Sequence, residues 1–417
     1  MERARDALFE LSDAVIERPH VRSLAELSCS PVFRRKWSST YEALDDGLLN
    51  RENLMRLCIG HIAEEGRPIL AGDHTAWTRL WARTLPDRTY EHQSTPVPGR
   101  RPITIGHAYS TVVWVPEMEG SWALPLLNER ISSTETPCEK ASQQLEGVCN
   151  ALSVRPITLW DSEYGCAKFV RQTSHIPADK IIRLRTNLCL YGVPDRCKGR
   201  GARPKHGRKI KFHDPGTWQN PDETLHVDAA GFGPMVVRVW NQVHFRQAPD
   251  HPFILAQIER QQAPYTKRTP RVLWFAWVGL DPPRADWWQL YTRRYTVDHW
   301  YRFAKGRLHW TQPMLSTPQR CELWSDLMML NTWELWLARP IVHDEALPWQ
   351  KPQPRPVPGR VCQGMAGILA VIGTPAQSPK PRGKSPGWPV GRSRKRKERF
   401  ALVRSSRYKP KPQPSAA

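Results

Sequence analysis

Pro68-Ile-Leu-Ala-Gly-Asp73 is the stretch that decides the fold of this 417-residue chain. A short apolar run that follows a proline and ends in an acid predicts a buried β-strand with a carboxylate at its end. A second stretch, Arg155-Pro-Ile-Thr-Leu-Trp-Asp161, has the same form. We therefore expect two buried strands in one sheet, with Asp73 and Asp161 held rigidly at their ends.

The segments around these two strands complete a recognisable order. Further strands are expected at 103–115, 121–125 and 180–190, and helices at 138–152 and 166–173. Strand, strand, strand, helix, strand, helix, strand is the order of a ribonuclease-H-like core. The predicted fold class is therefore mixed α/β (α+β), built on such a core.

Five parts are expected along the chain. Apolar residues recur at helical spacing in 4–16 and 51–62, and strand-like runs cover 235–245, 253–257 and 272–279. The expected parts are a helical N-terminal domain at 1–64, which binds DNA ends or serves as a packing cap; the first part of the core at 65–211; a β-rich insertion at 212–283; the helical completion of the core at 284–345; and a basic, Pro-rich and largely disordered tail at 346–417.

The segment Tyr291–Lys305 is expected to form one amphipathic helix. At about 100° per residue, the polar side chains at 291, 294, 298 and 305 share one arc. The neighbouring apolar stripe consists of Val297, Tyr301, Ala304 and Leu308. Such a helix packs along one face and presents one acid, Asp298, among basic and hydroxyl groups.

Asp73, Asp161 and Asp298 are predicted to be the catalytic and metal-ligating residues. Cutting a phosphodiester with Mg²⁺ requires carboxylates around two ions about 4 Å apart, and oxygen ligands suit this cation. Taken singly, each acid also fits a purely structural role. Asp73 and Asp161 could be turn or helix-cap residues, and Asp298 an ion-paired residue on a helix surface. Their joint occurrence in this order favours the catalytic interpretation. Glu163 and Asp326 are the fallback carboxylates.

The charge of the chain points to a polyanionic partner, with nucleic acid first. The net charge is +21 and the pI is about 9.9. Residues 351–417 hold 16 Lys and Arg against one acid, Glu398. A basic loop at 193–211 and the block Arg392–Arg399 are expected to contact phosphates without reading sequence. The loop contributes Arg203, Lys205, Arg208, Lys209 and Lys211.

The cysteine spacing and the N-terminal residues indicate the cellular compartment in which the protein is expected. Nine cysteines occur and none forms a Cys-x-x-Cys pair, so reduced thiols are expected rather than zinc sites or a disulfide framework. The start Met-Glu-Arg-Ala-Arg-Asp is unlike a signal peptide, and no apolar run reaches the roughly 18 residues of a membrane span. We expect a cytoplasmic protein with no membrane partner.

Together these motifs resemble the DDE transposases of bacterial insertion sequences, in the subgroup marked by Tyr-x2-Arg-x3-Glu-x6-Lys. The resemblance covers roughly 60–400. Asp73-His-Thr resembles the family's Asp-x-Thr, and Asp161-Ser-Glu-Tyr-Gly resembles its Asp-Ser-x-Tyr-Gly. Tyr291, Arg294 and Lys305 fit the third signature, with Asp298 in place of Glu.

The resemblance implies a ribonuclease-H-like domain interrupted by a β insertion before the third acid. It implies two Mg²⁺ or Mn²⁺ ions per site, DNA cleavage followed by strand transfer, a homodimer on DNA and a bacterial, nucleoid-associated location. Tyr291, Arg294, Arg302 and Lys305 would then bind DNA near the cut. Members often stack a flipped base on an aromatic ring. The candidates for this role are Trp240, Trp274, Trp277, Trp287 and Trp288.

Asp298 leaves alternatives open, since Asp reaches one methylene less far than Glu. One alternative is a catalytically impaired or domesticated DNA-binding relative of a transposase. Another is a metal-dependent nuclease without strand transfer. A basic RNA-associated protein explains the charge but not the three ordered acids.

Overall fold

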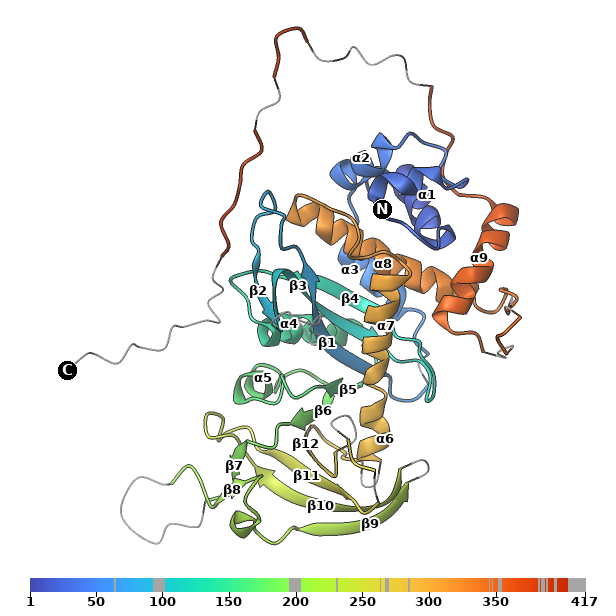
Figure 1. Ribbon diagram of the computed structural model, residues 1–417. Helices are drawn as coiled ribbons and strands as arrows, with labels where there is room; N and C mark the ends of the chain where they lie inside the picture. The colour runs from blue at the N-terminus through green and yellow to red at the C-terminus, as the bar shows by residue number, and fades with distance from the viewer. Residues whose placement is uncertain are drawn as a thin grey trace, which may run out of the picture.

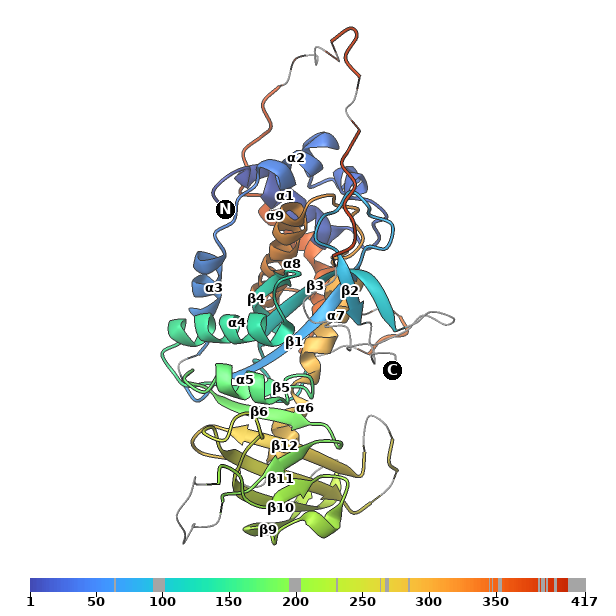
Figure 2. The ribbon, with the colours of Figure 1, turned by 90° about the vertical axis from the view of Figure 1, so that its left-hand side faces the viewer.

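The computed structural model describes residues 1–403 apart from 64, 93–101, 195–203, 230–231, 263, 267–269, 284–285, 345, 347, 352–354, 382, 384–386, 388 and 394–395. In these residues the chain is a mixed α/β protein with one ten-stranded mixed sheet. Helices cover both faces of the upper part of the sheet (Figures 1 and 2). This architecture is compatible with the ribonuclease-H-like core expected from the sequence.

The core sheet is built from six strands around the parallel triplet β1, β5 and β6. These strands are β1 (Ile69–Thr78), β2 (Thr89–His92), β3 (Ile103–Trp114), β4 (Leu124–Ile131), β5 (Ile157–Trp160) and β6 (Asp179–Leu184). The strand expected at 121–125 is wrong in position, because pairing with β3 holds residues 124–131 instead. The strands expected at 103–115 and 155–161 are confirmed to within two residues at their ends.

Residues 212–283 do contain strands, and these strands extend the core sheet. They are β9 (Glu223–Ala229), β10 (Gly233–Val243), β11 (Phe253–Arg260) and β12 (Val272–Val278). Two short strands precede them, β7 (Cys189–Tyr191) and β8 (Lys209–Lys211). Strand β12 pairs antiparallel with β6, so the order β5-β6-β12-β11-β10-β9 is continuous, while β7 and β8 form a separate pair. In Figure 1 these strands are the lower half of the molecule.

Helices cover the sheet and form a layer at the N-terminus. They are α1 (Arg5–Glu17), α2 (Ser38–Asp46), α3 (Arg51–Ile59), α4 (Pro137–Ala151), α5 (Ala167–Gln172), α6 (Trp287–Thr292), α7 (Tyr295–Gly306), α8 (Pro318–Ala338) and α9 (Pro358–Ile372), with 3-10 turns at Leu24–Cys29 and Pro215–Thr217. Helices α4 and α5 lie on one face, and α7 and α8 on the other (Figure 2). Helix α4 begins with a capping box between Thr136 and Glu139.

The expectation of one continuous helix at Tyr291–Lys305 is wrong. Helix α6 ends at Thr292 and α7 begins at Tyr295. Between them the amides of Arg293 and Arg294 donate to carbonyls three residues back, at 3.2 and 3.0 Å, rather than four. Such bonds tighten the turn, so the polar arc inferred for a regular helix is twisted at its N-terminal end.

The expectation of a largely disordered tail is wrong for Pro358–Ile372, which is helix α9. The helix forms because apolar residues at helical spacing bury one side of it. Val361, Met365 and Leu369 are each 4% exposed or less. The helix packs on α1 and α8 (Figure 1). None of the helices in the described part of the chain has the length and apolar character that crossing a bilayer requires.

Candidate active site around Asp73

The parallel register of β1 and β5 places Asp73 beside Asp161. The last paired residues are Gly72 and Trp160, so the next residue on each strand lies at the same level. Gly72 is required here, because a Cβ at this position would lie 2.1 Å from the Trp160 ring. The ring packs over Gly72 on one side of the sheet, and alternation directs both aspartates to the other side.

Asp73 lies in the middle of its strand, and the expectation that the strand ends there is wrong. Strand β1 continues to Thr78, and Asp73 pairs with Thr111 of β3. The Asp73 carboxylate is accommodated on this face because Arg294 pairs with it. Asp161 does follow the end of its strand, as expected. Its carboxylate accepts a hydrogen bond from the amide of Glu163 at 2.8 Å.

Arg294 links two of the three predicted acids. Its guanidinium donates to Asp73 Oδ2 at 3.0 Å and to Asp298 Oδ2 at 3.3 Å. Arg294 is only 7% exposed. The Asp298 side chain is 44% exposed, whereas that of Asp73 is 14% exposed. The inner acid is thus shielded from water, and the outer acid faces solvent at the start of α7.

Two side chains of α7 fix this helix against the strand that carries Asp73. The Tyr301 hydroxyl donates to the Asp73 carbonyl at 3.0 Å. Lys305 Nζ donates to Thr75 Oγ1 at 2.7 Å and to the Ala76 carbonyl at 3.0 Å. Burial lowers the pKa of Lys305 to about 8. The apolar stripe expected on this helix is confirmed: its four residues are 6% exposed or less.

Burial and neighbouring charges act in opposite directions on the pKa of Asp73. Burial raises the pKa of Asp73 to about 6; Arg294 opposes this rise, and the charges of Asp161 and Asp298 add to it. Burial alone would lower the pKa of Arg294, but Asp73 and its other acidic neighbours raise it above its usual value. A further cation would therefore stabilise the ionised carboxylates.

The donor chemistry at this site fits a hard divalent cation. Carboxylate oxygens are the ligands such an ion prefers. In the described chain, however, no three His, Cys, Asp or Glu side chains lie close enough to hold one ion together. Asp298 is held by Arg294 instead. Arg294 also pairs with Asp73 at 3.0 Å, so one guanidinium neutralises two of the three predicted acids, while Asp161 lies level with Asp73 on the neighbouring strand.

Three residues near the acids were missed by the sequence reasoning. His74 lies with Nδ1 at 3.4 Å from the Tyr164 hydroxyl and Nε2 at 3.9 Å from Glu163 Oε2. Arg183 follows Ile182, the register partner of Trp160, and so lies level with Asp161. His74 and Tyr164 stand within the two Asp motifs, which was the available signal. Arg183 could be found only from strand register.

The predicted DNA-binding residues on α6 and α7 have different surroundings. Tyr291 is 1% exposed and packs against Phe275, with ring centroids 4.8 Å apart. Its burial raises its pKa to about 12. Arg302 is exposed on α7. The structure thus brings Arg294 and Lys305 to β1, places Tyr291 against β12, and leaves Arg302 on the outer surface.

The basic loop presents part of its charge to solvent. Lys205, Arg208 and Lys209 are exposed. Lys211 is half-buried and its ammonium lies 3.4 Å from Asp214. Arg203 lies outside the described residues. The side chains of Lys205, Arg208 and Lys209 thus face solvent, and Arg208 also donates to the Gly216 carbonyl at 3.4 Å.

The tryptophans considered for base stacking are all interior. Trp240, Trp274, Trp277, Trp287 and Trp288 are each 3% exposed or less. A ring must be accessible on one face to stack on a base, so these five serve the core in this structure. The fallback acid Asp326 is likewise engaged elsewhere, because Arg51 donates to both of its carboxylate oxygens at 2.9 and 3.0 Å.

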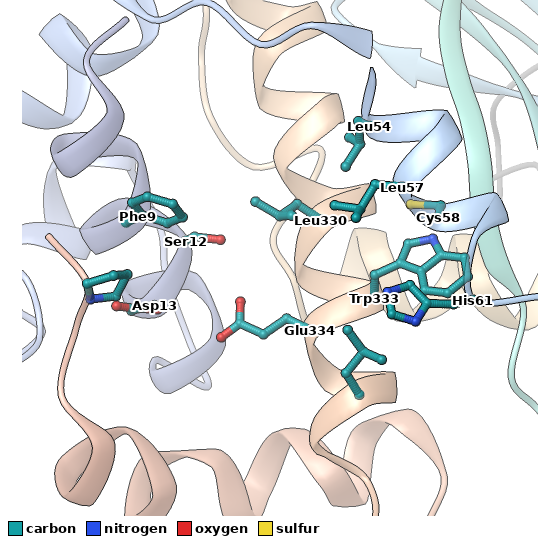
Figure 3. Close-up of a pocket in the computed structure, with 12 residues that line it drawn as sticks. Phe9, Ser12, Asp13, Leu54, Leu57, Cys58, His61, Leu330, Trp333 and Glu334 are labelled. Atoms are coloured by element: carbon teal, nitrogen blue, oxygen red, sulfur yellow. The ribbon is translucent and has the colours of Figure 1, made fainter. Parts of the chain in front are cut away.

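A second group of acids lines a cavity between α1, α3 and α8, which we call the helical cavity (Figure 3). Its volume is about 310 Å³ and its walls are mostly apolar. Asp13 is 7% exposed, and Glu334 points into the space from α8. Burial raises the pKa of Glu334 to about 8, and the charge of Asp13 adds to this rise.

Comparison with known proteins places the chain in a family. No curated protein matches the sequence. Residues 1–242 match the family described as DDE superfamily endonuclease, which is more than half of the chain. The matched region includes Asp73 and Asp161 and ends before α6 and α7. Nucleases of this superfamily act on DNA and generally use divalent metals. Given the two level aspartates in a mixed α/β sheet and this match, the chain belongs to the DDE superfamily of endonucleases.

Proposed function

We propose that this protein is a transposase of the subgroup with the Tyr-x2-Arg-x3-Glu-x6-Lys signature. It would cut transposon-end DNA by metal-dependent hydrolysis and join the freed 3′-hydroxyl ends to target DNA. The observation that carries the proposal is the level placement of Asp73 and Asp161, with Asp298 linked to Asp73 through one buried arginine. The family match supports the nuclease part of the proposal.

In this proposal each acid has a defined task. Asp73 and Asp161 would hold one Mg²⁺ or Mn²⁺ ion, and Asp73 and Asp298 a second. When bound, such ions supply the charge that makes water a nucleophile and stabilises the departing 3′ oxygen. Asp73 would be the shared ligand because the charges of both Asp161 and Asp298 act on its carboxylate. His74 and Tyr164 would fix the base of the loop that carries Asp161.

The cations of α7 would position the DNA backbone. Arg294 presents a planar fork, which suits a phosphate as well as a carboxylate. When a DNA phosphate takes up the Arg294 fork, Asp298 is released toward the metal site. Lys305 of α7 would keep its hydrogen bonds with Thr75 and Ala76 of β1, and these bonds hold α7 in place against the strand. DNA binding and assembly of the third acid are thus coupled through one guanidinium.

The test is cleavage of end-containing DNA in the presence of Mg²⁺ or Mn²⁺. Wild-type protein should nick the DNA, and Asp161→Asn should not. Adding target DNA should then yield joined products from the 3′-hydroxyl ends. Undiminished cleavage by Asp161→Asn would contradict the assignment. Cleavage without joined products would identify a nuclease that lacks strand transfer.

One observation favours a second function, a DNA-binding relative with impaired chemistry. Asp298 has a shorter reach than Glu, and its carboxylate is held by Arg294 at the surface of the site. In this alternative the wild-type protein binds end-containing DNA but does not nick it. Asp298→Glu would then gain cleavage, because the longer side chain reaches past Arg294. A wild-type enzyme that nicks DNA on its own would exclude this alternative.

The remaining expectations concern assembly and place. We propose that the protein acts as a homodimer on paired DNA ends and resides with bacterial DNA in the cytoplasm. The exposed cations of the basic loop and the strongly basic tail support a large phosphate footprint. Sedimentation with and without paired end-containing DNA would measure the stoichiometry; one protein per DNA end-pair would contradict the dimer.

A further inference from the structure

Two cysteines face each other beside the segment that carries Asp161. Cys138 Sγ lies 3.9 Å from Cys166 Sγ. Both side chains are half-buried, so small solutes reach them. They are the cysteines brought together among those that the structure describes. The surrounding protein gives this pair properties that neither residue would have alone.

The two thiols are held opposite each other by a fixed scaffold. Cys138 lies in the first turn of α4, and Cys166 directly precedes α5. Lys168 ties the two helix starts together, donating to Thr136 Oγ1 at 3.2 Å and to Glu139 Oε1 at 2.7 Å. The sulfur atoms therefore stay near each other rather than diverging through side-chain motion.

The two thiols differ in acidity because of their contacts. The hydrogen bond from the Cys138 thiol lowers the pKa of Cys166 to about 6, and backbone amides of α5 and the Lys168 ammonium assist. The same hydrogen bond raises the pKa of Cys138 above its usual value. Because Cys166 lies at the N-terminus of α5 beside the Lys168 ammonium, we assign it the role of the attacking thiolate and Cys138 that of the resolving thiol.

Formation of a disulfide between Cys138 and Cys166 would shift the segment that carries Asp161. A disulfide has its sulfurs about 2.05 Å apart, so the two must approach by nearly 2 Å. The segment from Asp161 to Cys166 has little freedom, because Tyr164 is fully buried. A Cβ on Gly165 would already lie 2.7 Å from the Arg183 carbonyl oxygen. Catalytic constellations tolerate only about 0.5 Å of misplacement.

We propose that Cys138 and Cys166 form a reversible thiol–disulfide site that hydroperoxides oxidise, and that its closure displaces the segment carrying Asp161. The Cys166 thiolate attacks one oxygen of hydrogen peroxide and the O–O bond breaks. The other oxygen leaves as hydroxide and takes a proton to become water. The Cys138 sulfur loses its proton and attacks the Cys166 sulfenic acid. The S–O bond breaks and a second water leaves, so two thiols are oxidised and one peroxide is reduced.

The first arm of the test follows the thiols directly. Full-length protein is titrated with hydrogen peroxide, alkylated and analysed by peptide mass spectrometry. A Cys138–Cys166 disulfide should form about ten times faster than Cys189 is modified, since the two sulfurs already lie 3.9 Å apart and Cys189 has no cysteine partner among the described residues. In Cys138→Ser, whose hydroxyl keeps the hydrogen-bond donor, Cys166 should stop at a sulfenic acid that dimedone traps. Oxidation of Cys189 at an equal rate would overturn the proposal.

The second arm follows the segment and rests on the proposed function. Hydrogen exchange of residues 161–166 should change on oxidation, and DNA cleavage should fall at least about tenfold and recover with dithiothreitol. Cys138→Ser should show neither change, and Cys189→Ser should behave as wild type. A disulfide that leaves exchange and cleavage unaltered would overturn the coupling. If the reduced protein does not cleave DNA at all, the proposed function fails, while mass spectrometry and hydrogen exchange still decide the thiol site.

Discussion

The acid site around Asp73 and the helical cavity around Glu334 both hold buried carboxyl groups with raised pKa values. At the acid site a buried arginine pairs with Asp73, and Lys305 of α7 donates hydrogen bonds to the strand that carries Asp73. In the helical cavity, Glu334 has no hydrogen bond or ion pair within the described residues, and its acidic neighbour Asp13 increases the cost of ionising it. The surroundings of Asp73 include a cation that stabilises its ionised form. The surroundings of Glu334 favour its protonated, neutral form.

This difference shows that a raised pKa alone does not identify a catalytic acid. Desolvation is the largest cause at both Asp73 and Glu334. The separating evidence is the set of neighbours: cations and level carboxylates at one place, apolar side chains at the other. Functional assignment therefore depends on partners and geometry more than on the size of a pKa shift.

The comparison breaks if the two acids behave alike in catalysis. Asp73→Asn should lower the rate of DNA cleavage by about a thousandfold or more, because a metal ligand supplies several kcal/mol of transition-state stabilisation. Glu334→Gln should leave the rate within about twofold, since its carboxyl is already mostly protonated at neutral pH. Cleavage of end-containing DNA measures both, with circular dichroism as the folding control. Equal losses would refute the distinction.

Substitution of Arg294 tests whether a cation is what distinguishes the acid site from the helical cavity. Arg294→Lys keeps the charge but loses the planar fork that spans Asp73 and Asp298. We expect a loss of about 10–100-fold in cleavage, the value of one or two charge-assisted hydrogen bonds. Arg302→Lys, on the exposed side of the same helix, should change cleavage by less than about threefold. A wild-type rate in Arg294→Lys would show that charge alone suffices.

The helical cavity gives the opposite pH dependence from a paired carboxylate. The folded pKa of Glu334, about 8, is above its ordinary value of 4.5, so the folded state holds its proton while the unfolded state loses it. Stability should therefore fall as pH rises from about 4.5 to 8. Glu334→Gln should remove that fall and stabilise the protein by about 1–3 kcal/mol at pH 8, with little effect at pH 4.5.

Thermal unfolding at the two pH values measures this effect. The matched control is Glu119→Gln, at an exposed acid, which should change the melting temperature equally at both pH values. A Glu334→Gln variant that is destabilised at pH 8 would show that the carboxylate has a stabilising partner. The cavity would then resemble the acid site more than we infer.

The smallest effect concerns the basic block near the end of the chain. The backbone at Phe400 and Val403 is anchored to the segment before β2, where Arg83 and Arg88 carbonyls accept their amides at 2.8 and 2.9 Å. The adjacent cations are thus held on the core. Replacing Arg392, Arg396, Lys397 and Arg399 by Gln should flatten the salt dependence of DNA affinity by roughly one unit of slope per engaged phosphate. Filter binding at several salt concentrations measures it, and an unchanged slope would mean that the block does not engage DNA.

Much of the fold could be predicted because its signals are local. The strands before Asp161 and around Val112, and helix α4, were expected from the sequence and lie within two residues of the expected bounds. The end of β1 could not be predicted, because Asp73 reads as a strand terminator until its partner Thr111 is known. The joining of β12 to β6 was equally hidden, since no local pattern records which strand edge pairs with which.

The candidate site was predictable in its acids and not in its contacts. Asp73, Asp161 and Asp298 follow from motif spacing, and Arg294 was expected to meet phosphate. Its pair with Asp298 has the i,i+4 spacing that made an ion-paired Asp298 one of the expected roles. Its pair with Asp73 could not be predicted, because it depends on how α7 packs against β1. The tail helix α9 was missed for a related reason: its apolar face has meaning only beside α1 and α8.

The unbroken ladder from β5 through β6 to β9 makes the lower half of the molecule mechanically one piece with the catalytic strand. Four antiparallel strands are hydrogen bonded in series to β6, and β6 is hydrogen bonded to the strand that ends beside Asp161. Strands β12 to β9 lie in the chain between Asp161 and Asp298, and they belong to the same hydrogen-bonded sheet as the strand that carries Asp73. A molecule bound at β9 or β10 would therefore contact the far edge of the sheet that holds the predicted acids.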